Sequence, residues 1–511
     1  MVEVSRTARV IQNAKVALFF YCINLILQFF SRKIFLDYLG AELLGLNTTA
    51  QNLLQFLNLA ESGIGAAVAF ALYKPLSQGN RQEIIDIVSL QGWFYRWVGL
   101  FVIAGSMVLM AFFPWIFAKA DVPLIYAYGT FIAFLISALL GYFVNYKMIV
   151  LSADQKEYKI TIETQSIKVG KVLIQMLTIW KLPNGYLWWM ILEAAAAILT
   201  SVRLTYCIKN EYPWLVTDIS KGKFLNKQYP ELLLKIKQLF FHKIGSFVLW
   251  QSTPLVIYGF TSLTWVAIYG NYFILMVGCL MLVEAVFRGV NAGVGNLVVK
   301  CDVKLIKSVF WQIITARLFL AGMICSGIFS LSENFVILWV GEDYILPTSP
   351  LLVMTAIFFI QMSRTCDMFL SAYGLFKDIW APFVESTLNV LLSILLGYFW
   401  GLTGIFLGVL ISQLIIVNGW KPYFLYSQGF KFRFFEYIVL YTKKLSLLFM
   451  AILVSLYIYE TLFDEFPINI ANWLFSTFSF VLIYICIGAI IFTVFDSSFR
   501  LLIKKVFGFV F

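Results

Sequence analysis

Residues 29–74 read FFSRKIFLDYLGAELLGLNTTAQNLLQFLNLAESGIGAAVAFALYK, and this stretch decides the fold. It is too long and too apolar for a loop, yet a series of polar residues runs through it: Asn47, Gln51, Asn52, Gln55, Asn58 and Glu61, before Gly63-Ile64-Gly65. Because an unpaired polar group in hydrocarbon costs several kcal/mol, a helix with this polar face cannot turn it to lipid. We therefore expect a membrane helix whose polar face lines a protein-walled, water-filled cavity.

The pattern recurs later in the chain. Residues 274–300 read ILMVGCLMLVEAVFRGVNAGVGNLVVK, in which Glu284, Arg288 and Asn291 precede Gly293-Val294-Gly295. This recurrence predicts two copies of one helical unit around a shared cavity. We interpret the two Gly-x-Gly sequences as the points where the polar part of each helix ends.

The composition is that of a polytopic membrane protein. Hydrophobic residues make up 61% of the 511 positions and charged residues 13%, against roughly 45–50% and 25% in soluble domains. Many apolar runs reach the ~20 residues that a helix needs to cross a bilayer. We predict an all-α protein with about fourteen spans, at residues 16–38, 42–73, 87–113, 124–148, 160–181, 186–208, 242–263, 266–299, 308–331, 347–373, 379–400, 402–420, 445–463 and 471–495.

These spans suggest a four-part organisation. Residues 1–208 form a first six-helix lobe, 209–241 a basic cytoplasmic loop, 242–426 a second six-helix lobe, and 427–511 a C-terminal helix pair with a basic tail. Within the loop, YPELLLKIKQLFFHK (229–243) has the pattern of a basic amphipathic helix on the inner membrane face. Because each lobe has an even number of spans, both enter from the same side and should be related by an axis along the membrane normal.

The basic residues predict the orientation. With the N-terminus inside, most Lys and Arg residues fall in the even-numbered connections and the two tails, so both termini are expected in the cytoplasm. The net charge of +11 then reflects basic loops facing an anionic leaflet, and it requires no nucleic-acid partner. The N-terminal segment lacks a small-residue cleavage site after its apolar core, which indicates an uncleaved first helix.

Several function classes lack their sequence signatures. The chain contains no GxxxxGK[ST] phosphate loop and no HExxH pair. Its seven cysteines include no CxxC pair, and the single histidine, His242, lies at the start of a predicted helix. We therefore predict neither a metal site nor a cofactor.

The residues SRKIFLDYLGAELLGLN (31–47) and ESGIGAAV (61–68), with two six-helix lobes and two further helices, resemble the bacterial polysaccharide and O-antigen repeat-unit flippases. These belong to the multidrug/oligosaccharidyl-lipid/polysaccharide exporter superfamily. The resemblance implies two lobes that rock about a central cationic cavity in the cytoplasmic membrane. It implies transport of an undecaprenyl-diphosphate-linked oligosaccharide between leaflets, with no covalent chemistry, and polysaccharide polymerases and glycosyltransferases as partners.

Membrane-depth cations are the candidate ligands for a lipid diphosphate, because its concentrated negative charge must cross hydrocarbon. The candidates are Arg32, Lys33, Arg288 and Arg364. Each has an alternative interpretation. Arg32 and Lys33 could extend to the outer interface. Arg288 could pair with Glu284 at i−4, and Arg364 with Asp367 at i+3.

Two further sets of polar residues fall within the predicted spans. Asn47, Gln51, Gln55 and Asn58 lie largely along one helical stripe, where they could bond sugar hydroxyls or neighbouring helices. Glu61, Glu284 and Asp367 are carboxylates that could bind H⁺ or Na⁺ and couple transport to an ion gradient, or serve as counter-ions for arginines.

Two other functions compete with a flippase. A multidrug exporter of the same fold should have a more acidic cavity, suited to cationic drugs. A membrane-bound polysaccharide polymerase or sugar transferase should have a sizeable catalytic outer loop, whereas the predicted outer loops are short.

Overall fold

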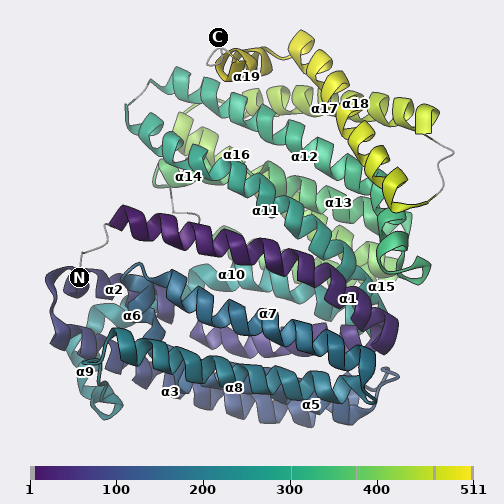
Figure 1. Cartoon of the computed structure of the whole chain (residues 1–511). Coiled ribbons are helices and arrows are strands. Elements are labelled where there is room, and N and C mark those ends of the chain that lie inside the picture. The colour runs from purple at the N-terminus through teal and green to yellow at the C-terminus, as the bar shows by residue number, and fades with distance from the viewer. Residues whose placement is uncertain (1–5, 301, 376–377, 379, 464–467, 508–511) are drawn as a thin grey trace. The chain divides into compact units, whose positions relative to one another are not determined.

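The computed structural model describes residues 6–300, 302–375, 378, 380–463 and 468–507. Side chains are described throughout these ranges except at 6–11, 238–239, 241–246, 249, 288–289, 291–293, 296, 299–300 and 506–507. Every regular element within the described residues is a helix (Figure 1). The predicted all-α, polytopic membrane architecture is confirmed.

Ten helical segments among the described residues are long and apolar enough to span a membrane. Two of them, Gln12–Glu61 and Trp380–Phe430, each cover two predicted spans. Helix α7 (Glu157–Lys181) falls outside this set because it is rich in charge. Its charged side chains pair with helix α8 (Gly185–Glu211), and the pairs are Lys159–Glu211, Glu163–Arg203 and Lys171–Glu193.

The chain divides into two compact units, Met1–Ala267 and Ile268–Phe511, here called the N-terminal and C-terminal units. The boundary lies inside helix α11 (Leu263–Lys300), whose first residues pack with the N-terminal unit. Helix α10 (Pro230–Phe260) contains almost all of the 229–243 segment, so this amphipathic stretch continues without a break into predicted span 7. The division at 208, 241 and 426 stays a prediction.

The N-terminal unit is built around α1, which packs against α7, while α7 packs against α8 (Figure 1). Its elements, besides α7, α8 and α10, are α1 (Arg6–Asn58), η1 (Leu59–Glu61), α2 (Ile64–Gln78), α3 (Arg81–Ala111), α4 (Phe113–Ile116), α5 (Leu124–Phe143), η2 (Asn145–Met148), α6 (Ile149–Ala153), η3 (Ile219–Lys221) and α9 (Gly222–Gln228). Helix α1 kinks at Gly40, whose φ of 82° favours a residue without Cβ, and this kink separates predicted spans 1 and 2.

The C-terminal unit contains the rest of α11 and the elements that follow it. These are α12 (Val303–Trp339), η4 (Glu342–Tyr344), α13 (Thr348–Ser363), α14 (Cys366–Ala372), α15 (Trp380–Gln413), η5 (Leu414–Trp420), α16 (Lys421–Phe424), η6 (Leu425–Phe430), α17 (Phe434–Phe463), α18 (Ile470–Phe495) and α19 (Ser497–Phe507). Helix α15 changes direction at Trp400 and Gly401, where predicted spans 11 and 12 meet. The segments η5 and η6 have π-helical hydrogen bonding.

The C-terminal helix pair α17 and α18 packs on α12 (Figure 1). Gly322 permits this approach, because an added Cβ would lie 2.4 Å from a Leu448 methyl carbon and 2.6 Å from the Tyr484 hydroxyl. A buried ion pair joins Lys444 of α17 to Asp496, which follows α18, and the Lys444 ammonium also donates to Thr315 of α12 at 2.7 Å. The predicted helix pair is therefore an integral part of the C-terminal unit.

Candidate functional site

A break between α13 and α14 is the centre of the candidate site. Helix α13 ends at Ser363 and α14 begins at Cys366, so predicted span 10 is interrupted at Arg364 and Thr365. Arg364 has φ −59° and ψ 90°, which is non-helical. Neither glycine nor proline occurs between Thr348 and Ala372 beyond Pro350 near the start of α13, so the local sequence does not explain the break.

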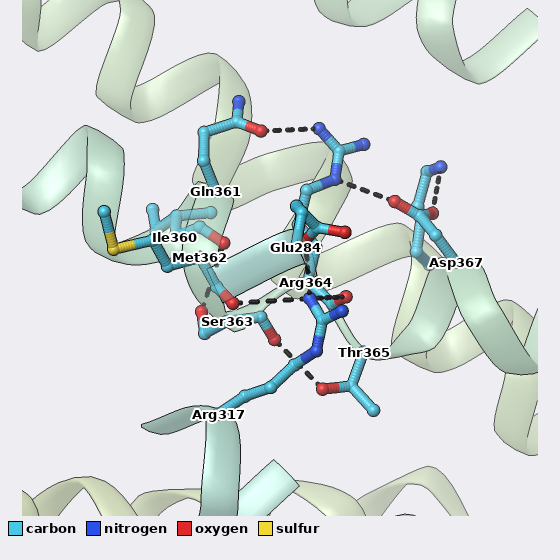
Figure 2. A network of polar contacts seen from close by, with 10 residues as sticks. Glu284, Arg317, Ile360, Gln361, Met362, Ser363, Arg364, Thr365 and Asp367 are labelled. Carbon is cyan, nitrogen blue, oxygen red and sulfur yellow. Dashed lines mark hydrogen bonds and ion pairs between the residues drawn. The ribbon is translucent and has the colours of Figure 1, made fainter. Parts of the chain in front are cut away.

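The Arg364 side chain bridges this break (Figure 2). Its Nε donates to Asp367 Oδ2 at 2.7 Å, and its Nη1 donates to Gln361 Oε1 at 3.1 Å. The described residues provide no hydrogen-bond partner for the third nitrogen, Nη2. Because 24% of the side chain is exposed, this guanidinium retains donor capacity for a ligand.

Asp367 contacts a second cation. The ammonium of Lys421, at the start of α16, donates to Asp367 Oδ1. The carboxylate therefore receives Arg364 on one oxygen and Lys421 on the other. Charge-assisted contacts of this kind are shorter and stronger than neutral hydrogen bonds.

A third cation, Arg317 of α12, lies beneath the break (Figure 2). Its Nη1 donates to Glu284 Oε1 of α11 at 3.0 Å and to the backbone carbonyls of Met362 and Arg364 at 3.3 and 2.9 Å. The guanidinium also lies 4.6 Å from the centre of the Phe287 ring. Its side chain is only 3% exposed, whereas that of Glu284 is 45% exposed.

These groups surround a cavity of about 640 Å³ within the C-terminal unit, a volume typical of ligand sites. Its lining residues are Leu280, Glu284, Gly295, Arg317, Gln361, Arg364, Asp367, Met368, Ser371 and Ala372. Helices α11 to α14 thus combine arginines, carboxylates and an apolar wall in one place. Such a cavity can bind a ligand with a polar, charged head and an apolar portion.

The structure brings together three of the predicted site residues, Glu284, Arg364 and Asp367. The predicted i,i+3 pair of Arg364 and Asp367 is present, although it crosses a helix break. Glu284 contacts Arg317, which belongs to another helix, α12. The side chain of Arg288 lies outside the described residues.

The predicted cations of α1 are placed differently. Arg32 donates from a terminal nitrogen to the carbonyl of Ala267 at 2.9 Å, so it contacts the first turns of α11. Nearby, Glu42 accepts from Thr264 at 2.7 Å. The backbones also meet closely here, because a Cβ on Gly45 would lie 2.0 Å from the Leu263 carbonyl oxygen. These contacts give Arg32 a structural partner in the N-terminal unit.

Lys33 is exposed and lies 3.5 Å from Asp37, one turn further along α1. The structure therefore shows it in a surface ion pair. Pairs of this kind contribute little to stability, because water screens both charges.

The predicted sugar-binding stripe is divided between two environments. Asn47 accepts a hydrogen bond from Tyr186 at 2.7 Å, and Asn58 accepts one from Tyr142 at 2.9 Å, so both oxygens bond neighbouring helices. Gln51 is exposed and Gln55 is half-buried, and the described residues supply no hydrogen bond to either side chain. Glu61 accepts from Tyr95 at 2.9 Å, outside the C-terminal cavity.

Sequence reasoning missed three members of the site, Arg317, Gln361 and Lys421. Arg317 is a charged residue deep within the otherwise apolar sequence of α12, and membrane-depth charge of this kind is itself a functional signal. Lys421 follows the predicted end of span 12 by one residue, and Gln361 is adjacent to the predicted Arg364 on the helix surface.

No protein-family model matches the chain, and no curated protein matches its sequence. Solved structures match most of the length of this chain. One is the lipid II flippase MurJ in an inward-closed conformation, with 16% identity over 94% of this chain and 99% of that chain and a TM-score of 0.66.

Two MATE structures also match. An inward-facing multidrug resistance MATE family transporter of the MOP superfamily has 11% identity over 79% of this chain and 94% of that chain, with a TM-score of 0.60. A MATE structure in a bent conformation has 11% identity over 83% and 96%, with a TM-score of 0.52. At these identities the likeness establishes the fold alone, and membership of the exporter superfamily stays a prediction.

Proposed function

We propose that this protein is a flippase that moves undecaprenyl-diphosphate-linked oligosaccharide repeat units across the bacterial cytoplasmic membrane by alternating access. The repeat units would be used for a surface polysaccharide such as O-antigen or capsule, with a polysaccharide polymerase and glycosyltransferases as partners. Both termini are proposed to be cytoplasmic. The proposal rests on the Arg364 guanidinium, which lies at a helix break in a polar cavity. Two of its nitrogens donate to Asp367 and Gln361, and the third is left for a ligand.

The chemistry of the cargo matches this cavity. A diphosphate accepts hydrogen bonds in a forked arrangement that guanidinium groups fit. Arg364 has a guanidinium nitrogen left for the ligand, while Arg317 and Lys421 balance the charges of the carboxylates that they contact, Glu284 and Asp367. Arg288, on the helix that carries Glu284, remains a proposed ligand. The similar fold of a lipid II flippase supports a lipid-linked cargo.

Sugar and ion contacts are assigned on the same basis. Gln51 and Gln55 are the proposed sugar contacts, because Asn47 and Asn58 already bond tyrosines. Glu284 is the proposed coupling carboxylate for H⁺ or Na⁺, because its side chain is 45% exposed and has one cationic partner among the described side chains, whereas Asp367 has two. Glu61 is a weaker candidate, since it accepts from the neutral hydroxyl of Tyr95.

One observation favours a multidrug exporter as the second candidate. Glu284 is the most exposed of the paired charged groups in the cavity, and a carboxylate open to the cavity could receive a cationic drug. One of the similar structures is a multidrug resistance MATE family transporter.

Binding to purified protein in lipid nanodiscs separates the two functions. We expect undecaprenyl diphosphate to bind, and Arg364→Gln to weaken binding about tenfold or more, because a charged hydrogen bond is lost. The matched control is Arg203→Gln, which removes an arginine from an exposed ion pair in the N-terminal unit and should leave affinity unchanged. Binding of tetraphenylphosphonium that depends on Glu284, without binding of undecaprenyl diphosphate, would instead establish the exporter.

A further inference from the structure

The break between α13 and α14 needs a cause from outside its own sequence. Helix breaks commonly arise at proline or glycine, or where a side chain inserts into the backbone hydrogen-bond ladder. Around Arg364 the first two are absent. The third is present, because Arg317 of α12 reaches the carbonyls of Met362 and Arg364.

Three consecutive carbonyls at the break accept side-chain hydrogen bonds. Arg317 donates to the first and the third, at 3.3 and 2.9 Å, and the Thr365 hydroxyl donates to the Ser363 carbonyl between them at 3.2 Å. A helix that ends must satisfy its last carbonyls in some other way. Arg317, which belongs to another helix, donates two of these three hydrogen bonds.

Arg317 donates to the backbone of Arg364, and Arg364 is the residue whose side chain faces the cavity. Although Arg317 lines the cavity, its side chain is only 3% exposed and its Nη1 already has three acceptors. The side chain of Arg364, whose backbone carbonyl is one of those acceptors, is 24% exposed. Figure 2 shows Arg317 below the break and the Arg364 side chain above it.

We propose that Arg317 is a positioning residue, which holds the α13–α14 break in the conformation that directs the Arg364 guanidinium into the cavity. It acts on an anionic ligand only through Arg364. This inference rests on the proposed function for the identity of the ligand, but its structural part concerns the break itself.

The first measurement needs no ligand. Amide hydrogen exchange of residues 360–372 should be faster in Arg317→Met than in the native protein, because two carbonyls of the break lose their donor. The matched control is Lys444→Gln, which removes a comparably buried cation that contacts α12 at Thr315 and lies outside the cavity lining. It should leave exchange at the break unchanged. Unchanged exchange in Arg317→Met would overturn the proposal.

The second measurement is a double-mutant cycle with inorganic diphosphate as the probe. Arg317→Met and Arg364→Gln should each weaken binding about tenfold, and the double variant should bind about as weakly as Arg364→Gln alone. Additive losses, of about a hundredfold in the double variant, would show that Arg317 contacts the ligand directly and would overturn the proposal. Arg317→Lys should recover part of the affinity, because an ammonium can still donate to the carbonyls but lacks the guanidinium fork.

The two measurements separate this inference from the proposed function. If the native protein fails to bind diphosphate while exchange at the break still depends on Arg317, the proposed function is wrong and the positioning of the break stands. If diphosphate binds and needs Arg364, but neither measurement responds to Arg317, the proposed function stands and the positioning role is wrong.

Discussion

The helices that carry Glu61 and Glu284 differ in continuity and in their partners. In the N-terminal unit, α1 ends at Asn58, a short η1 turn holds Glu61, and Gly63 adopts φ 98° before α2 begins. Helix α11, which carries Glu284 in its C-terminal-unit part, runs without interruption from Leu263 to Lys300. Glu61 accepts from the hydroxyl of Tyr95, whereas Glu284 accepts from the guanidinium of Arg317.

This difference shows that the neighbouring helices determine what a membrane-depth carboxylate does. Helices α3 and α5 offer Glu61 and Asn58 the neutral hydroxyls of Tyr95 and Tyr142. Helix α12 offers Glu284 a buried cation that is also bound to the α13–α14 break. Hydrogen bonds from neutral tyrosine hydroxyls chiefly join helices, whereas the arginine beside Glu284 also creates a site with a strong electrostatic field. Under the proposed function, the head-group site would lie in the C-terminal unit.

The largest effect that would test this comparison is on stability. Glu284→Leu leaves the buried Arg317 without its carboxylate, so we expect a loss of about 2–3 kcal/mol, moderated by the 45% exposure of Glu284. Glu61→Leu removes the acceptor of the Tyr95 hydroxyl, which is neutral, and should lower the free energy of unfolding by about 1 kcal/mol. Thermal unfolding in one detergent, with membrane abundance measured alongside, compares the two.

The double variant Glu284→Leu/Arg317→Met is the control for this prediction. It removes both charges and should recover part of the lost stability, because neither charge of this pair is left unpaired, while the carbonyls of Met362 and Arg364 still lack their donor. Equal losses for Glu61→Leu and Glu284→Leu would mean that the two carboxylates are equivalent and would remove the basis of the comparison.

The fold was predictable because its determinants are local. Apolar run length places most spans, and Gly40 and Gly401 mark two of the turns between them, at the predicted boundaries 38/42 and 400/402. The pairing of Arg364 with Asp367 was also predictable, since residues three apart are neighbours on a helix surface. Composition alone indicated the membrane class.

The rest of the site depends on contacts between residues far apart in the chain. Arg317 is 33 positions from Glu284 and 47 from Arg364, and Lys421 is 54 positions from Asp367. No spacing rule within one helix relates such residues. The i−4 pairing of Glu284 with Arg288 stays a prediction, because the Arg288 side chain lies outside the described residues, whereas the contact of Arg317 with Glu284 depends on the packing of α12. Similarly, Asn47 bonds a tyrosine 139 positions away.

The two glycine sequences provide a smaller effect. Gly63→Ala should lower stability by about 1–2 kcal/mol, because Gly63 has φ 98° and a Cβ is strained there. Gly295→Ala should raise it by about 0.5–1 kcal/mol, because Gly295 lies within α11 and an added Cβ meets open space. The paired thermal unfolding curves check the opposite signs. A shift of the same sign in both would contradict the difference in helix continuity.

The smallest effect concerns an ion pair of the N-terminal unit that lies outside the predicted spans. Glu211, at the end of α8, contacts the Lys156 ammonium at 2.6 Å and also pairs with Lys159. Burial acts to raise the pKa of Glu211, but the hydrogen bonds and charges of the two lysines outweigh it and hold the pKa below its usual value. Burial acts to lower the pKa of Lys156, and its bonds to Asp154 and Glu211 hold that pKa above the usual value.

The signs of these shifts fix the pH dependence. A carboxylate with a lowered pKa stabilises the folded state above its unfolded pKa of about 4.3, and this contribution disappears as the pH falls through the folded pKa. An ammonium with a raised pKa contributes below its unfolded pKa of about 10.4 and loses its effect as the pH rises further. Glu211→Gln should therefore destabilise the protein most between about pH 5 and 10, by about 1 kcal/mol or less because the pair is partly exposed. Melting temperatures across pH test this, with the exposed Glu231→Gln as the matched control.

Diphosphate affinity should not change in Glu211→Gln, because this ion pair joins helix ends in the N-terminal unit. A loss of affinity there would place ligand chemistry in both units and would contradict the asymmetry between Glu61 and Glu284.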